Sequence, residues 1–526
     1  MSDTTNDPSP QAGSERARIQ HIIVVMMENR SFDHLLGYLQ HEDPGYPNLD
    51  RIGAGCPEDP DDPRSRWVPT SADASRVLGV NPDHSAAAVM MQLYGRSNPS
   101  SADKPTMTGF IRSYQLKVEG SSQHTTSLLA RITDYLSAVW ARIRRRPAPV
   151  VPSAADIMKC FPEADVPVLS RLAKEFAVLV NWHSSVPGET WPNRNFAHSA
   201  TSDGETAIDV RWYENETIFE QLAAAGRRWG IYHDGVAQVW AFWRLWIRDR
   251  TPFHDPGTLL EHIALDSLPA YSFVEPNHGY GRSPGNSQHP GNNLVDDASF
   301  TAGEALIGGI YNALVEQPEV FAKTLLLVTY DEHGGFFDHV QPPTVPAPDA
   351  KCSPSGFEFG ICGVRVPAIA VSPLIARGTV DQTFYDHASI PRTVRAQFAP
   401  DSPPLTARDE AANDFLAAIP LLPTVRTDYA PVDVPPAKPL AEALVTQTLD
   451  DFEASLLELA GAVKTQLERP SSAESAGTPP FAPDGDLSVA ARMHRMTPPA
   501  RQAVDEVLGM FQFTPPIGPD DTERGP

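Results

Sequence analysis

Five short apolar runs limit the folds open to this chain more than any other feature of its sequence. Each run is almost wholly apolar and ends abruptly in polar residues; the runs cover 21–29, 174–182, 269–277, 323–335 and 365–373. Strands that are apolar on both faces are typical of a parallel sheet buried between two layers of helices. Helical patterns separate the runs, and this alternation predicts an α/β fold with a mainly parallel sheet flanked by helices.

The clearest helical pattern covers residues 301–318. Thr301 precedes Glu304 by three positions, the spacing of a capping box, in which two side chains bond to the backbone of a helix's first turn. We therefore expect a helix that begins at Thr301. A second helical pattern covers residues 450–468, in the C-terminal part of the chain.

Composition divides the 526-residue chain into several parts. A polar tail, which we expect to be disordered, covers 1–20, and one large domain covers 21–400 with an insertion at about 112–155. Beyond this domain Pro, Ala and Asp become abundant. That composition predicts a partly helical extension at 401–469 and a linker and tail at 470–526.

Net charge narrows the classes of partner. The chain carries 42 Lys and Arg residues against 66 Asp and Glu residues, a formal net charge of −24. We therefore expect no nucleic-acid partner, because binding to a phosphate backbone requires a cationic face. A phosphate-bearing substrate stays compatible with this charge, since a bound metal ion reverses the potential of an acidic pocket.

Neither the cysteines nor the N-terminus indicates export. The four cysteines form no C-x-x-C pair, as expected of free thiols in a reducing compartment, and Cys352 and Cys362 would be the best disulfide pair in an exported protein. The first residues contain no apolar signal segment, and no apolar stretch is long enough to cross a bilayer. We expect a cytoplasmic protein, with export by a non-classical route as the alternative.

Polar residues stand directly after two of the predicted strands. Glu28 and Asn29 end the first run, and Asp331 and Glu332 come directly after the apolar part of the fourth. Because the carboxyl ends of parallel strands share one edge of the sheet, these side chains should lie together. Three carboxylates in one place repel one another unless a cation lies between them, and oxygen ligands suit Ca²⁺, Mg²⁺ or Mn²⁺. The set predicts a site for one divalent metal ion; helix capping and surface acidity are the alternative.

A hydroxyl, an amide and a guanidinium lie close together in the segment 188–204. Thr190 would become a nucleophile if a metal ion lowered the pKa of its hydroxyl, and Asn193 and Arg194 would hold the segment or a phosphate. The alternative is a simple turn around Pro192.

Four histidines, His84, His233, His289 and His339, stand beside Asp or Pro in predicted loops. A neutral imidazole can bind a metal ion, and a protonated one can hold phosphate or give a proton to a leaving group. Solvated loop histidines are more common than either, and spacing alone assigns none of the four to a site.

Five motifs, in the same order along the chain, resemble the phosphoesterase family of bacteria and plants. They are "ENRSFDHLLGYL", "VPGETWPNR", "HPGNN" with "GEALIGGIYNAL", "TYDEHGGFFDHVQPP" and "GVRVPAIAVSP", and they lie between about residues 21 and 395. This family holds non-specific and phosphatidylcholine-preferring phospholipases C and the respiratory-burst-inhibiting acid phosphatase. Its fold is similar to that of the alkaline phosphatase superfamily.

The resemblance implies a role for each residue that matches a motif. Thr190 takes the nucleophile position, where the phospholipases carry Thr and the acid phosphatase carries Ser. His84, His233 and His289 fall at expected active-site positions, whereas His339 fits a structural role. The implied ligands of one divalent metal ion are Glu28, Asn29, Thr190, Asp331 and Glu332.

One residue departs from the family pattern. Glu189 stands where family members commonly carry Pro, immediately before the nucleophile. An extra carboxylate at this position would disfavour a dianionic substrate.

The function that the resemblance implies is that of a metal-dependent phospholipase C. Such an enzyme hydrolyses the glycerol-side phosphodiester bond of phosphatidylcholine and related phospholipids, through a phosphothreonine intermediate, to diacylglycerol and a phosphorylated headgroup. A broad-specificity acid phosphatase with the same site is the alternative, and an inactive lipid-binding protein is the minor one. Thr190 and an aromatic run at 239–246 favour a diester substrate.

The insertion contains an amphipathic pattern at 128–146. Its apolar residues recur at spacings of three and four, and four arginines gather near its C-terminal end. The pattern indicates an interfacial helix that makes transient contact with a membrane surface, with its arginines on lipid phosphates. The alternative is a helix packed on the domain with its arginines in solvent.

Overall fold

The computed structural model describes residues 16–511, apart from 101–102, 124–151, 280–284, 294–296, 437–450, 469–480, 483–486, 489–490 and 492–497. The amphipathic pattern at 128–146 therefore lies outside the described residues, as does most of the predicted tail at 1–20. Among the described helices, none combines the length and the apolar character needed to cross a membrane.

An eight-stranded sheet forms the centre of the protein, in the order β10-β4-β9-β8-β1-β7-β5-β6. Its strands are β1 (His21–Met27), β4 (Ala177–Trp182), β5 (Trp229–His233), β6 (Phe253–His254), β7 (Tyr271–Glu275), β8 (Thr324–Tyr330), β9 (Ala368–Val371) and β10 (Thr379–Tyr385). β9 runs antiparallel to both of its neighbours, and the other pairs are parallel. The structure thus confirms the mainly parallel α/β sheet, and all five apolar runs form strands in it.

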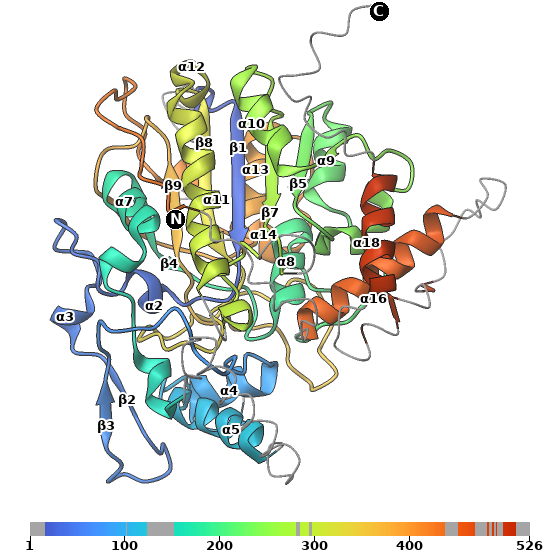
Figure 1. Cartoon of the computed structure of the whole chain (residues 1–526). Helices are drawn as coiled ribbons and strands as arrows, with labels where there is room; N and C mark the ends of the chain where they lie inside the picture. Colours follow the sequence, from blue (N-terminus) through green and yellow to red (C-terminus); the bar gives the residue numbers. More distant parts are fainter. Residues whose placement is uncertain are drawn as a thin grey trace, which may run out of the picture.

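Helices cover both faces of the sheet. Figure 1 shows α11 in front of the sheet and α13 behind it; α11 packs on α7, and α13 packs on α8 and α9. The described helices are α2 (Phe32–Leu36), α3 (Leu49–Ile52), α4 (Ala86–Tyr94), α5 (Phe110–Gln123), α7 (Pro167–Glu175), α8 (Thr190–Ser199), α9 (Ile218–Ala224), α10 (Pro256–Ala264), α11 (Ala298–Val315), α12 (Pro318–Phe321), α13 (Ser389–Phe398), α14 (Ala407–Ala411), α15 (Phe415–Ala418), α16 (Asp451–Leu467) and α18 (Pro498–Met510).

A smaller lobe lies at the end of the molecule toward which β1 points (Figure 1). It consists of α3, α4, α5 and the two-stranded sheet of β2 (Gly55–Pro57) and β3 (Trp67–Pro69). Its apolar side chains form a hydrophobic cluster of their own, which includes Val89, Phe110 and the Phe336–Phe337 pair that follows β8. The lobe is therefore packed against the loop at the carboxyl end of a central strand.

The aromatic run at 239–246 belongs to the main core. Trp240 and Trp246 are fully buried. The ring of Trp240 stacks on Phe511 with 4.3 Å between the ring centroids and 3° between the planes. The run is therefore a packing element, and it does not favour any substrate class.

The C-terminal part of the chain adds two helices to this core. α16, which the sequence predicted, packs against α18, and α18 falls inside the range 470–526 that the sequence predicted to be linker and tail. Leu456 and Val463 of α16 and Val507 of α18 are fully buried. Burial of these apolar side chains holds α18 against α16. The sequence did not predict α18 because Pro-rich and Ser-rich segments surround it.

All four cysteines are free thiols, as expected; Cys352 is exposed and Cys362 is buried.

Glu304 caps a helix other than its own. α11 begins at Ala298, so Thr301 and Glu304 both lie inside the helix and the predicted capping box is wrong. Instead, Glu304 Oε2 accepts hydrogen bonds from the backbone N–H groups of Val168 (2.7 Å) and Leu169 (3.5 Å) at the start of α7, which has no side-chain cap of its own. Complete burial raises the pKa of Glu304 to about 7, although these hydrogen bonds oppose the rise.

Glu304→Gln should change how stability depends on pH. The folded-state pKa lies above the ordinary value of 4.5, so the stabilising contribution of Glu304 is complete below pH 4.5 and is lost as the pH rises through about 7. The neutral amide does not titrate. Between about pH 5 and pH 8 the variant should gain up to about 3 kcal/mol of stability relative to the wild type. Thermal midpoints at both pH values measure this, with exposed Glu316→Gln as the control; parallel curves for wild type and Glu304→Gln would contradict the prediction.

Candidate active site

The ends of β1 and β8 hold the centre of the candidate site. Met27 lies opposite Tyr330 in the parallel register, so Glu28 and Asp331 are the next residues on neighbouring strands. The backbone N–H of Asn29 donates to Asp331 Oδ1 over 3.1 Å. The structure thus brings the two predicted polar clusters together at the carboxyl edge of the sheet.

Arg194 links this edge to α8. Its side chain is fully buried; Nε lies 3.0 Å from Asp331 Oδ2 and Nη1 lies 3.3 Å from Glu275 Oε2. Nη2 donates to the carbonyl of Met26 over 3.1 Å. Of the two roles that the sequence left open for Arg194, the structure supports holding the segment, because strand-end carboxylates already bind the guanidinium.

Thr190 is the first residue of α8. Its hydroxyl donates to Asn29 Oδ1 over 3.3 Å, which places the predicted nucleophile against a predicted metal ligand. Pro192 in the first turn does not interrupt the helix, because the N–H groups there have no intrahelical partner. "TWPN" is therefore a helix start and not an isolated turn, and the positive end of the helix dipole lies at Thr190.

Asn193 fixes the loop that precedes Thr190. Its Oδ1 accepts from the N–H of Val186 over 3.0 Å, and its Nδ2 donates to the carbonyls of Val186, Gly188 and Glu189. The amide thus holds the segment, as the sequence suggested for it.

Asn29 has a left-handed backbone conformation, with φ of 58°. Such a conformation costs free energy in a residue other than glycine and persists only where neighbours impose it. Gly334, with φ of +65°, packs so closely that a Cβ on it would lie 2.1 Å from the carbonyl oxygen of Asn29. The glycine of "DEHGG" is therefore needed for the position of Asn29.

Two of the predicted histidines, His84 and His289, lie next to the ends of β1 and β8. His84 Nε2 is 3.5 Å from Asn29 Nδ2, and the rings of His84 and His289 meet edge to face with 5.8 Å between centroids. The segment that carries His289 is anchored to the end of β1: Glu28 N donates to the carbonyl of Ser287 over 2.9 Å, and Arg30 Nε donates to that of Gln288 over 3.0 Å.

The other two predicted histidines lie farther out. His233 ends β5 and pairs in register with Glu275, so it is at the same sheet edge with β7 between it and β1. His339 Nδ1 is 2.7 Å from Asp33 Oδ2, in a network with Asp338 and Arg365. That network supports the structural role expected for His339.

Sequence reasoning missed His278. Its Nδ1 lies 2.9 Å from Glu28 Oε2 and its Nε2 lies 3.0 Å from Glu275 Oε1, all fully buried. Burial lowers the pKa of His278, but the two carboxylates outweigh burial and raise this pKa to about 9. The ring also meets Phe452 of α16 edge to face at 4.8 Å. His278 follows the "EPN" that ends β7, and its position after a strand was the one available signal.

The cluster holds more carboxylates than cations. When all are ionised, the four buried carboxylates of Glu28, Glu275, Asp331 and Glu332 face two cations, Arg194 and protonated His278, which leaves an excess of two negative charges. A bound cation, or protonation of two of the carboxylates, would offset this excess. Burial raises the pKa values of Asp331 and Glu332, and repulsion from Glu28 adds to both increases.

Two buried carboxylate oxygens without hydrogen-bond partners also indicate that a cation binds here. Within the described residues, Glu28 Oε1 and Glu332 Oε1 are buried without a hydrogen-bond partner. Buried carboxylate oxygens without donors are costly unless they bind a cation. The set therefore offers oxygen ligands to a divalent metal ion, although Glu28, Asp331 and Glu332 do not bring three carboxylate oxygens within 4.8 Å of one another and Asp331 already accepts from Asn29, Glu332 and Arg194.

A second acidic group is the alternative metal site. In the described part of the chain, only Asp33, Asp338 and His339 form a trio of carboxylate and imidazole groups with ligand atoms within 4.8 Å of one another. Arg365, however, lies 3.0 Å from Asp33 Oδ1 and 2.9 Å from Asp338 Oδ1. All four carboxylate oxygens of Asp33 and Asp338 already accept hydrogen bonds, so this trio has fewer free ligand atoms for a metal ion than the cluster at Glu28.

Comparison with known proteins found a matching family model, relatives in a plant and a bacterium, and similar solved structures. A model of the phosphoesterase family matches residues 19–399. The non-specific phospholipase C6 of Arabidopsis thaliana is 32% identical over 465 residues, covering 84% of this chain and 80% of its own. Phospholipase C A of Mycobacterium tuberculosis (strain CDC 1551 / Oshkosh) is 25% identical, covering 76% and 77%. A solved protein of the alkaline phosphatase superfamily from Vibrio parahaemolyticus is 12% identical, covering 44% of this chain and 60% of its own, with a TM-score of 0.29.

Gly334→Ala should displace Asn29 from its left-handed conformation. The added Cβ would lie 2.1 Å from the Asn29 carbonyl oxygen at a φ of +65°, so the loop must shift. We expect a loss of about 1–3 kcal/mol in stability, and at least about a tenfold loss in phosphoester hydrolysis. Thermal midpoints and initial rates measure both. Gly360→Ala is the control, since its Cβ would meet no atom within 4 Å; equal effects of the two substitutions would contradict the prediction.

Proposed function

The chain belongs to the phosphoesterase family, and on that basis we propose that it is a metal-dependent phospholipase C with Thr190 as its nucleophile. The observation that carries the proposal is the hydroxyl of Thr190. It lies at the start of α8, 3.3 Å from Asn29 Oδ1, beside the carboxylates at the ends of β1 and β8. Relatives named phospholipase C match more than three quarters of the chain.

The proposed metal ligands are Glu28, Asn29, Thr190, Asp331 and Glu332. A bound divalent cation would supply the positive charge that lowers the pKa of the Thr190 hydroxyl and neutralises the substrate phosphate. The support for this set is the excess of two negative charges and the buried oxygens of Glu28 and Glu332 without donors.

The reaction proceeds in two displacements at phosphorus. Thr190 Oγ1 forms a bond to phosphorus as the bond from phosphorus to the glycerol oxygen breaks, and the glycerol oxygen takes a proton from a histidine of the His84–His289 pair. The proton released by Thr190 restores that histidine. Water then forms a bond to phosphorus as the bond to Thr190 breaks, which returns the hydroxyl and frees the phosphorylated headgroup.

Fixed groups orient these atoms. Asn29 holds the Thr190 hydroxyl, Asn193 holds the preceding loop, and Arg194 ties α8 to the strand that carries Asp331. Such positioning places a nucleophile near its target before reaction and reduces the entropy lost at the transition state.

Glu189 favours diesters over monoesters. It is the N-cap of α8, adjacent to Thr190, and its charge contributes to the raised pKa of Glu332, after the larger effect of burial. A phosphomonoester dianion carries one more negative charge than a phosphodiester, so a carboxylate at this position repels it more strongly. The preference for phosphatidylcholine rests on the family resemblance.

Thr190→Ala should abolish turnover and leave the fold intact. The substitution removes the proposed nucleophile and a single hydrogen bond to Asn29, so we expect a fall of about a thousandfold or more in kcat with a nearly unchanged thermal midpoint. Hydrolysis of phosphatidylcholine is the assay, and Thr190→Ser, which keeps a hydroxyl, should retain far more activity. Turnover by the alanine variant within about tenfold of wild type would rule out Thr190 as the nucleophile.

Metal content should distinguish the two acidic groups. Glu332→Gln removes a charge from the proposed ligand set, whereas His339→Gln alters the trio whose two carboxylates Arg365 already binds. Elemental analysis of the purified proteins should show metal lost from the first variant and kept by the second. A chelator should lower the thermal midpoint of the wild type, because an ion that binds the folded state stabilises it. The reverse pattern of metal loss would assign the ion to Asp33, Asp338 and His339.

A further inference from the structure

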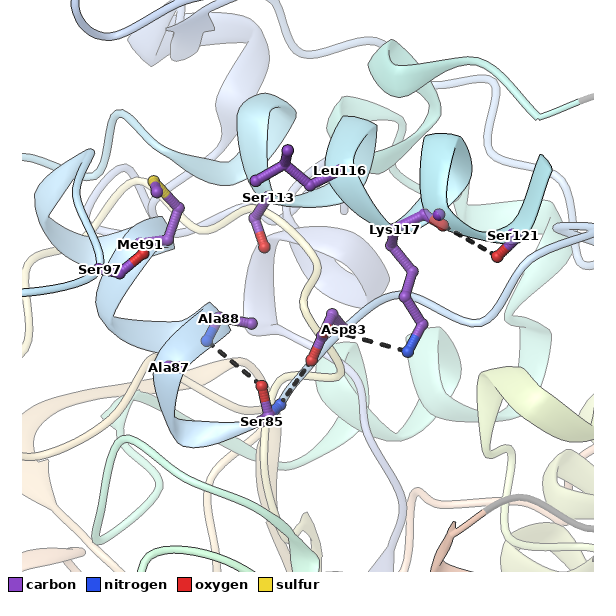
Figure 2. A pocket seen from close by; sticks show the side chains of 11 residues that line it. Asp83, Ser85, Ala87, Ala88, Met91, Ser97, Ser113, Leu116, Lys117 and Ser121 are labelled. Atoms are coloured by element: carbon purple, nitrogen blue, oxygen red, sulfur yellow. Dashed lines mark hydrogen bonds and ion pairs between the residues drawn. The ribbon is translucent and has the colours of Figure 1, made fainter. Parts of the chain in front are cut away.

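A groove lies between α4 and α5 (Figure 2). Its volume of about 560 Å³ lies in the range of roughly 300–1,000 Å³ that is typical of ligand sites. Ala87, Ala88 and Met91 of α4 line one wall, and Leu116 of α5 lines the other. Leu116 is 46% exposed, so its apolar surface is accessible to a ligand.

One loop separates this groove from the catalytic centre. Asp83 and Ser85 line the groove, and His84 between them reaches the centre, with Nε2 3.5 Å from Asn29 Nδ2. Lys117 closes part of the rim, with Nζ 3.8 Å from Asp83 Oδ2 (Figure 2). The residue between two residues that line the groove therefore contacts the catalytic centre.

Gln92 fixes the groove relative to the centre. Its fully buried amide donates to the carbonyl of Asp83 over 2.8 Å and to Ser113 Oγ over 3.2 Å. Its Oε1 lies 2.7 Å from Nε2 of His333, the residue that follows Glu332. One side chain thus joins both helices of the groove to the end of β8.

We propose that this groove binds an acyl chain of the phospholipid substrate and sets the enzyme's preference for lipid over water-soluble diesters. The inference rests on the proposed function. In a glycerophospholipid the acyl chains begin only a few bonds from the phosphorus–oxygen bond that is cleaved. A substrate with its phosphorus at Thr190 must therefore direct an acyl chain over a neighbouring wall, and the apolar surface of Ala88, Met91 and Leu116 is suited to receive it.

The dependence of kcat/KM on the length of the acyl chain tests for such a site. Each methylene that leaves water contributes about fourfold to binding. Phosphatidylcholines with four to six carbons per chain, assayed below their critical micelle concentrations, separate binding in the groove from adsorption to an interface. The wild type should show kcat/KM rising with chain length. p-Nitrophenylphosphorylcholine, which has no acyl chain, serves as the reference diester.

Two adjacent methionines provide a matched pair of variants. Met91 lines the groove, while Met90, also half-buried on α4, is not among its lining residues. Met91→Glu places a carboxylate among the apolar side chains and should lower kcat/KM for the six-carbon lipid at least about tenfold, mainly through KM. Met90→Glu should leave the dependence on chain length intact. Leu116→Ser, at an exposed position that tolerates substitution, should reduce that dependence from the opposite wall.

The outcomes separate this inference from the function on which it rests. Loss of the chain-length dependence in Met91→Glu and Leu116→Ser, with p-nitrophenylphosphorylcholine hydrolysis within about twofold of wild type, supports acyl binding in the groove. Unchanged dependence in both variants, as expected if another part of the chain covers the groove, overturns the inference alone. Equal losses in Met90→Glu and Met91→Glu also overturn it. A wild type that hydrolyses neither the lipids nor the reference diester overturns the proposed function itself.

Discussion

The buried ion pair between Arg194 and Asp331 is the interaction on which the candidate site depends. It joins α8, which carries Thr190, to the end of β8, and the guanidinium also bonds to the carbonyl of Met26 in β1. Bringing two charges into the interior costs free energy, and leaving one of them without its partner costs about 3–5 kcal/mol. The pair therefore fixes α8 relative to both central strands, and with it the distance from Thr190 to Asn29.

The parallel sheet determines which side chains can meet. β1, β7 and β8 are neighbours and point the same way, so Glu28, Glu275 and Asp331 emerge at one edge although they are far apart in sequence. The repulsion among these carboxylates is then reduced by Arg194 and by His278. The positions of the carboxylates follow from the order and direction of the strands. The cations that pair with them come from two further segments, those of Arg194 and His278.

Much of the sheet and of this edge could be predicted from the sequence, because a strand buried on both faces leaves a continuous apolar run. β1, β4, β7, β8 and β9 were found in this way, but β5, β6 and β10 were missed. β5 has only five residues, one of them Gly230, β6 has two residues, and β10 is partly exposed and has no such run. His278 was missed because only the folded sheet places it between Glu28 and Glu275. The spacing of Thr301 and Glu304 predicted a capping box that the structure does not contain, because both residues lie inside α11 and Glu304 caps α7 across a tertiary contact.

The C-terminal helices extend the folded unit beyond the segment that the family model matches. The match to the family ends at residue 399, yet α16 places Phe452 against the ring of His278, and Phe511 stacks on Trp240 in the main core. The segment that the family model matches therefore ends before the folded unit does, whereas relatives such as the non-specific phospholipase C6 match 84% of the chain. A fragment cut at the boundary of the match would uncover aromatic surface and admit water to the His278–Glu28 pair, although every motif of the family would still be present in it.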